Sequence, residues 1–333
     1  MLEPTQGPPL RVVSTHPADG SGFECPISDL GCGVPINTSF RIRFDRYLLP
    51  STAVRQSFAL YTGEESNVVP PGNRLPALTP RYDLVERVVT YELPPGVRLQ
   101  PNTHYTAELV VPEPGSEFGF RAFDGAPLDE ETTLTVSFLT SNQEETRDAE
   151  APPTCSDLVY GRRSANFADQ RPPTFVSCNS ASCHDVDAPR MDLDLSSERG
   201  IFLTAVGRVA HQTETTPSTG VDLQNPVRFG ASMPRVDPGR PDNSYLMYKL
   251  LAARENYRDA TDPDPCATQY ENLAVDPVTC VPASSEETDR LRAWFLRGLP
   301  MPRTPTADAE PAWLTREQLR GIQAWIHAGA GCP

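Results

Sequence analysis

The sequence has only one lysine, Lys249, among its 29 basic residues, and it has no run of 18 consecutive apolar residues. Without such a run, we expect no membrane-spanning helix in this chain. Acidic residues number 44 and give a formal net charge of −15. Nucleic-acid binding depends on a concentrated basic surface, so this charge argues against a nucleic-acid partner. The composition therefore favours a soluble protein that works among other proteins.

The start of the chain lacks the basic and apolar stretches of a secretion signal. Eight cysteines in a chain with 36 prolines nevertheless indicate an exported protein, because structural disulfides persist in oxidising compartments. We expect that a signal was removed and that Met1 stands in its place. The expected location is the periplasm, the cell surface or the outer membrane, and a lipid anchor in the precursor stays open.

A length of 333 residues suggests about two domains. The first part of the chain contains short segments in which apolar and polar residues alternate, rich in β-branched and aromatic side chains. Turn sequences such as Pro17-Ala-Asp-Gly separate them. Several short strands at this spacing predict an all-β sandwich over residues 10–141. The predicted strands are residues 11–15, 39–44, 57–61, 87–91, 105–111 and 133–138.

Four motifs in this segment begin at Ser14 (Ser-Thr-His-Pro-Ala-Asp-Gly), Ile42 (Ile-Arg-Phe-Asp), Leu99 (Leu-Gln-Pro-Asn-Thr-His-Tyr) and Phe138 (Phe-Leu-Thr-Ser). Through them the segment resembles the bacterial Ig-like domains of surface-layer and other exported proteins. The resemblance implies a spacer or adhesion module. Tyr105 stands at the position of a tyrosine corner, in which the tyrosine hydroxyl holds the loop before its strand. The alternative is that Tyr105 is an ordinary tyrosine half-buried in that strand.

Residues 142–154 are polar and charged and end in a proline pair, which is typical of a linker. After them the pattern changes to helices separated by long irregular stretches. Apolar residues three and four apart predict helices that begin near Ser244, Ser285 and Thr315, with Thr315 as an N-cap. We therefore predict a second, mainly α-helical domain with long loops over residues 155–333.

The motif Cys178-Asn-Ser-Ala-Ser-Cys183-His184 is the feature most suggestive of chemistry. Covalent attachment of haem c needs two thiols for the porphyrin vinyl groups and a histidine directly after the second thiol, which binds the iron. The usual motif has a shorter gap between its cysteines. The motif predicts one covalent haem c held by Cys178, Cys183 and His184, and a small disulfide loop beside an ordinary histidine is the alternative.

Further motifs follow in order along the second domain. They are Met191-Asp-Leu-Asp-Leu, Val236-Asp-Pro-Gly-Arg-Pro-Asp-Asn-Ser-Tyr, Leu299-Pro-Met301-Pro and Ile322-Gln-Ala-Trp-Ile-His-Ala-Gly. With the cysteine motif they resemble the monohaem c-type cytochrome domains of exported myxobacterial and planctomycete proteins. The resemblance implies a cytochrome c-like fold in which a helix carries the attachment motif.

The same resemblance implies a methionine on the opposite haem face, and Met301 fits because it lies in a loop stiffened by a proline on each side. Ligation of iron by His184 and Met301 raises the reduction potential relative to two histidines. Met233 is the main rival, and His211, His327, water and an open position are further alternatives. A methionine that merely fills a gap in the core is the structural alternative.

The six other cysteines are available for disulfides. Short sequence separations favour Cys25 with Cys32 and Cys266 with Cys280, which leaves Cys155 with Cys332 to join the two ends of the second domain. This last bridge closes the longest loop and should therefore stabilise the protein most.

The leading hypothesis is an exported c-type cytochrome that passes single electrons to a redox protein partner, with the Ig-like domain as spacer or docking module. Such a carrier needs no substrate-turnover residues, so we expect no enzyme, and a haem peroxidase is the weaker variant. The alternative is a haem-free cell-surface structural or adhesion protein stabilised by disulfides.

Overall fold

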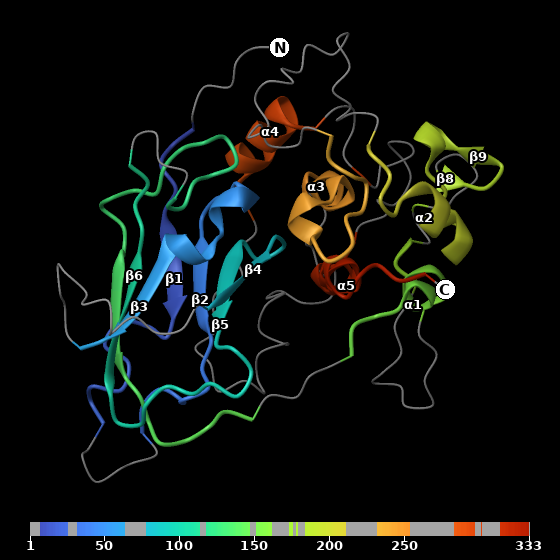
Figure 1. Ribbon diagram of the computed structural model, residues 1–333. Helices are drawn as coiled ribbons and strands as arrows, with labels where there is room; N and C mark the ends of the chain where they lie inside the picture. Colours follow the sequence, from blue (N-terminus) through green and yellow to red (C-terminus); the bar gives the residue numbers. More distant parts are fainter. Residues whose placement is uncertain are drawn as a thin grey trace. The chain divides into compact units, whose positions relative to one another are not determined.

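The computed structural model describes residues 7–25, 32–63, 78–113, 118–146, 151–161, 173–175, 178, 184–210, 232–253, 283–296, 301 and 314–332. The chain divides into two compact units. The N-terminal unit contains the described residues between 7 and 146, and the C-terminal unit contains those between 151 and 332. Figure 1 shows the elements of each unit along the chain. The predicted domain limits of 10–141, 142–154 and 155–333 stay a prediction.

The N-terminal unit consists of two antiparallel sheets, with strand orders β1-β2-β5-β4 and β3-β6-β7 (Figure 1). Lettered A to G along the chain, the strands form the sheets A-B-E-D and C-F-G, which is the strand order of a constant-type immunoglobulin sandwich. The expected all-β N-terminal region is confirmed. The strands are β1 (Val12–His16), β2 (Phe40–Phe44), β3 (Phe58–Thr62), β4 (Thr79–Asp83), β5 (Val88–Glu92), β6 (His104–Leu109) and β7 (Thr135–Leu139).

Aromatic side chains join the two sheets. Phe40 on β2 lies 5.5 Å from the ring of Phe58 on β3 and 5.5 Å from that of Phe138 on β7. Phe58 also stacks on Tyr91 of β5 with 4.4 Å between ring centroids. These rings are buried because side chains at alternate strand positions point to the same face, and both inner faces are apolar.

Tyrosine hydroxyls fix the connections between strands. The hydroxyl of the fully buried Tyr105 accepts a hydrogen bond of 2.8 Å from the backbone N–H of Gln100. This is the tyrosine-corner geometry, in which a hydroxyl near the start of a strand holds the preceding loop. The hydroxyl of Tyr82 on β4 accepts a bond of 2.9 Å from the N–H of Leu48. Burial raises the pKa of Tyr82 well above its ordinary value, so this hydroxyl stays protonated.

Strand β4 was not among the strands predicted from the sequence. Its five residues, Thr79-Pro-Arg-Tyr-Asp, contain a proline and two charged side chains, and this composition argues against a strand. The structure places β4 at the edge of the four-stranded sheet, beside β5 only. Proline is tolerated there because an edge strand needs N–H donors on one side only.

A disulfide joins Cys25 and Cys32, as predicted. The loop before it lies along the edge of β7, where Gly20 N–H donates to Ser137 O at 2.8 Å. Gly22 has a φ of 84°, and a Cβ there would lie 2.5 Å from the carbonyl oxygen of Leu139. Only glycine satisfies both the backbone conformation and this close approach.

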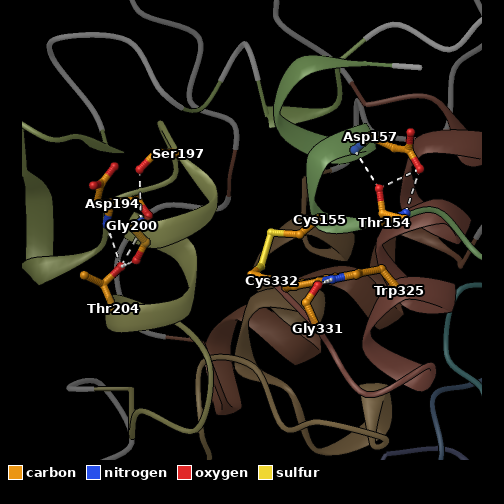
Figure 2. Close-up of a disulfide and its surroundings, with 10 residues drawn as sticks. All are labelled: Thr154, Cys155, Asp157, Asp194, Ser197, Gly200, Thr204, Trp325, Gly331 and Cys332. Atoms are coloured by element: carbon orange, nitrogen blue, oxygen red, sulfur yellow. Dashed lines mark hydrogen bonds between the residues drawn. A yellow bond between two sulfur atoms is a disulfide. The ribbon is translucent and has the colours of Figure 1, made fainter. Parts of the chain in front are cut away.

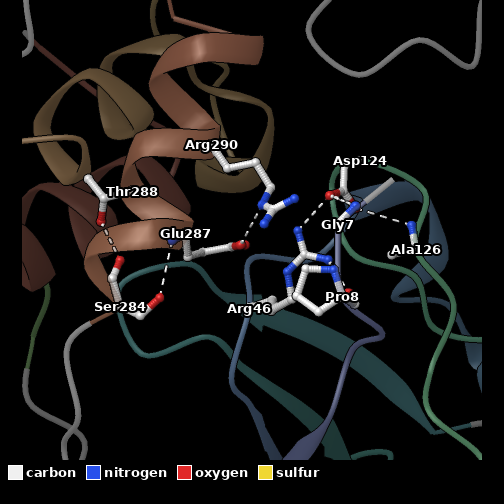
Figure 3. A network of polar contacts seen from close by, with 9 residues as sticks. All are labelled: Gly7, Pro8, Arg46, Asp124, Ala126, Ser284, Glu287, Thr288 and Arg290. Carbon is white, nitrogen blue, oxygen red and sulfur yellow. Dashed lines mark hydrogen bonds and ion pairs between the residues drawn. The ribbon is translucent and has the colours of Figure 1, made fainter. Parts of the chain in front are cut away.

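A buried ion pair anchors the start of the N-terminal unit (Figure 3). Arg46 donates to Asp124 Oδ2 at 2.6 Å and to Pro8 O at 2.6 Å. Asp124 also accepts from the N–H groups of Gly7 and Ala126 at 2.9 and 3.1 Å. Burial alone would raise the pKa of Asp124, but the hydrogen bond and charge of Arg46 hold it below the ordinary value. The carboxylate therefore stays ionised, with its oxygens paired.

The described part of the C-terminal unit contains five helices and the two-stranded hairpin of β8 (His184–Asp185) and β9 (Ala188–Pro189). Helix α5 packs against α1 and α3, and α1 also packs against α2. Apolar residues of α5 at helical spacing, Leu319, Ile322 and Ile326, are buried. The helices are α1 (Cys155–Tyr160), α2 (Glu198–Thr204), α3 (Tyr245–Leu251), α4 (Ser285–Trp294) and α5 (Arg316–His327).

Side-chain caps begin four of these helices, including α2, where the hydroxyl of Ser197 accepts from Gly200 N–H at 3.0 Å. Thr315 is the N-cap of α5, as predicted, and forms a capping box with Gln318. Thr154 and Asp157 form the same box at α1. At α4, the hydroxyl of Ser284 accepts from Glu287 N–H at 3.1 Å (Figure 3). These caps satisfy N–H groups that have no partner within the helix.

Candidate functional site

Two of the three residues predicted to attach haem are described. Cys178 is 3% exposed, and its N–H donates to Phe175 O at 2.9 Å. His184 is 8% exposed and begins strand β8, and its N–H donates to Cys178 O at 3.1 Å. The ring Nδ1 of His184 lies 3.1 Å from the carbonyl oxygen of Leu193. Cys183 lies outside the described residues.

The predicted methionine ligand, Met301, is half-buried, and its N–H donates to Lys249 O on α3 at 3.1 Å. Its main rival, Met233, is 3% exposed, and its carbonyl oxygen accepts from Ala210 N–H at 3.0 Å. His327 is half-buried in the last turn of α5. His211 lies outside the described residues.

The structure does not support the predicted haem cofactor. In the part of the chain that the structure describes, no three His, Cys, Asp or Glu side chains come together as a group able to hold a metal ion. His184 lies in a two-residue strand, whereas a cytochrome c-like fold would place the attachment motif on a helix. The prediction of haem c, and with it the resemblance to a c-type cytochrome, is wrong.

The proposed roles of Cys178, Cys183, His184 and Met301 depended on that cofactor. Electron transfer, iron binding and a redox partner lose their basis together with it. The expected cytochrome c-like helical arrangement is likewise not found among the described residues of the C-terminal unit.

The segment after His184 is instead held by a buried arginine. The guanidinium of Arg235 donates to the carbonyl oxygens of Met191, Asp192 and Thr204. Met191 and Asp192 have φ values of 56° and 55°, a conformation that side-chain-bearing residues adopt at some cost. Arg235 compensates for that cost and fixes the segment beside the C-terminal end of α2.

Asp194 also joins this segment to α2 (Figure 2). Its N–H donates to the hydroxyl of Thr204 at 2.9 Å, and its carboxylate accepts from Ser196 N–H at 2.8 Å. A Cβ on Gly200 would lie 2.2 Å from the Asp194 carboxylate, so the helix approaches closely only because glycine stands there.

A second disulfide joins Cys155, the first residue of α1, to Cys332, with 5.1 Å between their Cα atoms (Figure 2). This pairing was also predicted. The indole Nε1 of the buried Trp325 donates to Gly331 O at 3.1 Å and fixes the chain just before the bridge. The two ends of the C-terminal unit are thus cross-linked. Cys178 takes part in neither disulfide described here, and Cys266 and Cys280 lie outside the described residues.

The lone lysine is buried in the same unit. Lys249 on α3 is 6% exposed, with its ammonium 5.8 Å from the ring centroid of Tyr245. Burial lowers the pKa of Lys249 to about 8. The charged form of this side chain is therefore destabilised by its surroundings at neutral pH.

The sequence analysis missed the buried polar groups that stabilise each unit internally. Arg46 and Asp124 are far apart along the chain, and Arg235 follows an ordinary Met-Pro pair. Asp124 lies in a turn, in which Gly125 N–H donates to Ala122 O at 2.8 Å. No local pattern showed that its carboxylate would meet a buried arginine.

No helix among the described residues is long and apolar enough to span a membrane. The two disulfides are typical of an exported protein, as expected from the cysteine content.

No protein-family model matches this sequence. No curated protein matches it either. Three solved structures of the S-layer protein SbsC each match 44% of this chain. The crystal structure of rSbsC(31-844) is 14% identical with a TM-score of 0.25, and that of domains 1-6 is 15% identical with a TM-score of 0.25. The N-terminal part of this bacterial protein is 16% identical with a TM-score of 0.24. The matches span only 15, 15 and 25% of those chains, and likeness at this level carries no argument.

Proposed function

We propose that this protein is an exported, haem-free structural or adhesion protein of the cell surface, which acts through its shape and stability and not by chemical turnover. The observation that carries the proposal is that each of the two units contains a disulfide, Cys25–Cys32 in one and Cys155–Cys332 in the other. Such bridges persist outside the reducing cytosol.

The construction of the N-terminal unit supports this function. Its described strands, seven in number, have the strand order of an immunoglobulin sandwich, an architecture that many cell-surface domains use as a spacer or adhesion module. Fold alone does not establish function, so this support is by analogy.

The buried polar groups support it in a second way. Arg46 with Asp124, and Arg43 with Glu86 at 3.0 Å, are ion pairs in which every side chain is at most 5% exposed. Arg235 donates hydrogen bonds to three backbone carbonyl groups. These side chains hold the backbone in one arrangement, which suits a protein whose function depends on fixed geometry.

The test is to locate the chain on the cells that produce it. Intact cells would be treated with an antibody against the protein and with an added protease, with a cytosolic protein as the control. Cysteine oxidation would be read by mass spectrometry after thiol blocking and a non-reduced digest. We expect antibody binding and cleavage on intact cells, with Cys155 linked to Cys332. A chain protected inside the cell, or these four cysteines found as thiols, would refute the proposal.

A further inference from the structure

Exposed apolar side chains gather in one part of the C-terminal unit. Among the described residues, Phe202 and Leu203 on α2 are 53% and 47% exposed, and Val209 just beyond it is 41% exposed. Val186 in the β8–β9 turn and Met191 after β9 are 65% and 56% exposed. We call these five residues the apolar patch.

The two halves of the apolar patch lie on neighbouring segments that hydrogen bonds join. Helix α2 and the β8–β9 hairpin lie next to each other in Figure 1. Arg235 ties Met191 O to Thr204 O at the end of α2, and Asp194 bonds to Thr204. Five side chains exposed to this extent present several hundred Å² of apolar surface, which is the size that marks interaction sites on soluble proteins.

The two halves of the patch differ in the sign of their net charge. Arg199 and Arg208 are exposed on the α2 half, where Arg208 Nε donates to Leu203 O at 3.0 Å. On the hairpin half, Asp187 is exposed and Asp185 is half-buried. Counting also Glu198 on the first half, and Arg190 and Asp192 on the second, the α2 half has a net charge of +1 and the hairpin half of −2, in a chain whose overall net charge is −15.

A surface divided in this way is complementary to itself. In a two-fold symmetric pair, the same patch meets its own copy in the opposite orientation, so the basic half of each copy faces the acidic half of the other. Apolar side chains then lie at the centre and opposite charges at the rim, which is the usual anatomy of an interface.

We propose that the apolar patch is the contact through which a second copy of this chain binds, with Phe202 and Leu203 among its buried side chains and Arg199 opposite Asp187 of the other copy. This inference goes beyond the proposed surface function and does not depend on it. A stable dimer buries about 800 Å² on each partner, more than the patch alone provides, so the charged rim is part of the contact and the dimer is of moderate affinity.

The test is sedimentation velocity of the full chain from about 1 µM to about 0.5 mM, at low and high salt. We expect a monomer–dimer equilibrium that shifts toward monomer as salt increases. Leu203→Glu and Phe202→Glu should each weaken association roughly 30-fold, as for a hot-spot side chain. Val13→Glu is the matched control, because Val13 on β1 is also 47% exposed but lies in the other unit. It should leave association unchanged.

A charge exchange tests the pairing itself. Arg199→Glu and Asp187→Arg should each weaken association, and the double variant Arg199→Glu/Asp187→Arg should restore most of it, because each new charge meets its opposite in the other copy. Tryptophan fluorescence and circular dichroism check that all variants are folded. A protein that stays monomeric throughout would overturn the proposal, as would a dimer insensitive to Phe202→Glu. Absence of restoration in the double variant overturns the assigned pairing. Any of these results leaves the proposed surface function intact.

Discussion

Removal of the Cys155–Cys332 disulfide should destabilise the C-terminal unit far more than removal of Cys25–Cys32 destabilises the N-terminal unit. A cross-link lowers the entropy of the unfolded chain by an amount that grows with the logarithm of the loop it closes. The sequence separations are 177 and 7 residues. The chain-entropy relation then gives about 5 kcal/mol for the first bridge and about 2.5 kcal/mol for the second.

The assay compares Cys155→Ala/Cys332→Ala with Cys25→Ala/Cys32→Ala in guanidinium unfolding without reductant. The three tryptophans, at positions 294, 313 and 325, all belong to the C-terminal unit, so their fluorescence reports that unit selectively. The first double variant should lower the tryptophan-detected midpoint strongly and steepen the transition, because an unfolded chain without the bridge exposes more surface. The second double variant, Cys25→Ala/Cys32→Ala, should leave the midpoint of the tryptophan-detected transition unchanged.

Equal losses of stability in the two double variants would refute the loop-length argument. An unchanged tryptophan transition in Cys155→Ala/Cys332→Ala would show that the bridge contributes nothing to the folding of this unit. Circular dichroism in the far ultraviolet, which also reports the sheets of the N-terminal unit, should detect the smaller effect of Cys25→Ala/Cys32→Ala.

Three further predictions concern single side chains. Asp124→Asn should lower the stability of the N-terminal unit by about 3 kcal/mol in calorimetry, because Arg46 stays buried without its counter-ion. The folded-state pKa of Asp124 is depressed, so the difference in stability from wild type should vanish as the pH falls and this carboxyl is protonated. Lys249→Met should stabilise the C-terminal unit at pH 7 by about 2 kcal/mol in guanidinium unfolding, and the gain should fade between pH 8 and 10.5 as the unfolded lysine loses its proton. Tyr105→Phe should cost about 1 kcal/mol in calorimetry and speed hydrogen exchange at Gln100, whose N–H loses its acceptor.

Each of these three predictions has a control variant or a result that would contradict it. Asp129→Asn breaks the ion pair with Arg11, whose side chain is 62% exposed, and should change stability far less than Asp124→Asn does. A gain from Lys249→Met that is constant from pH 7 to 10.5 would mean that packing, not the buried charge, is responsible. For Tyr105→Phe, unchanged exchange at Gln100 would show that the hydroxyl does not hold the loop.

Local patterns in the sequence were enough to predict most of the N-terminal unit. Strands such as β2 alternate strictly, because the buried Phe40, Ile42 and Phe44 all face one side. Strand β4 was not predicted, because Pro80 argues against a strand unless the strand is known to lie at a sheet edge. The two described disulfides were predictable for different reasons. Cys25 and Cys32 are close in sequence, and Cys155 and Cys332 stand at the two ends of the second domain.

The candidate site could not be predicted in the same way. The spacing of Cys178, Cys183 and His184 specifies which atoms are available but not the backbone that presents them. In the structure His184 enters a strand, and its imidazole Nδ1 lies against the carbonyl of Leu193. The contacts that hold this region, such as those of Arg235, span more than 30 residues and leave no periodic trace in the sequence.

The bridge at the base of the C-terminal unit also determines how the chain responds to mechanical tension. Cys155 and Cys332 bring the entry and exit of this unit to 5.1 Å between Cα atoms. Tension applied to the chain before Cys155 and after Cys332 passes through the sulfur–sulfur bond and not through the helices between them. The 177-residue separation would otherwise release up to roughly 600 Å of extended chain. While the bridge is oxidised, tension between these two points bypasses the helices of the C-terminal unit, which therefore resist extension better than the strands of the sandwich.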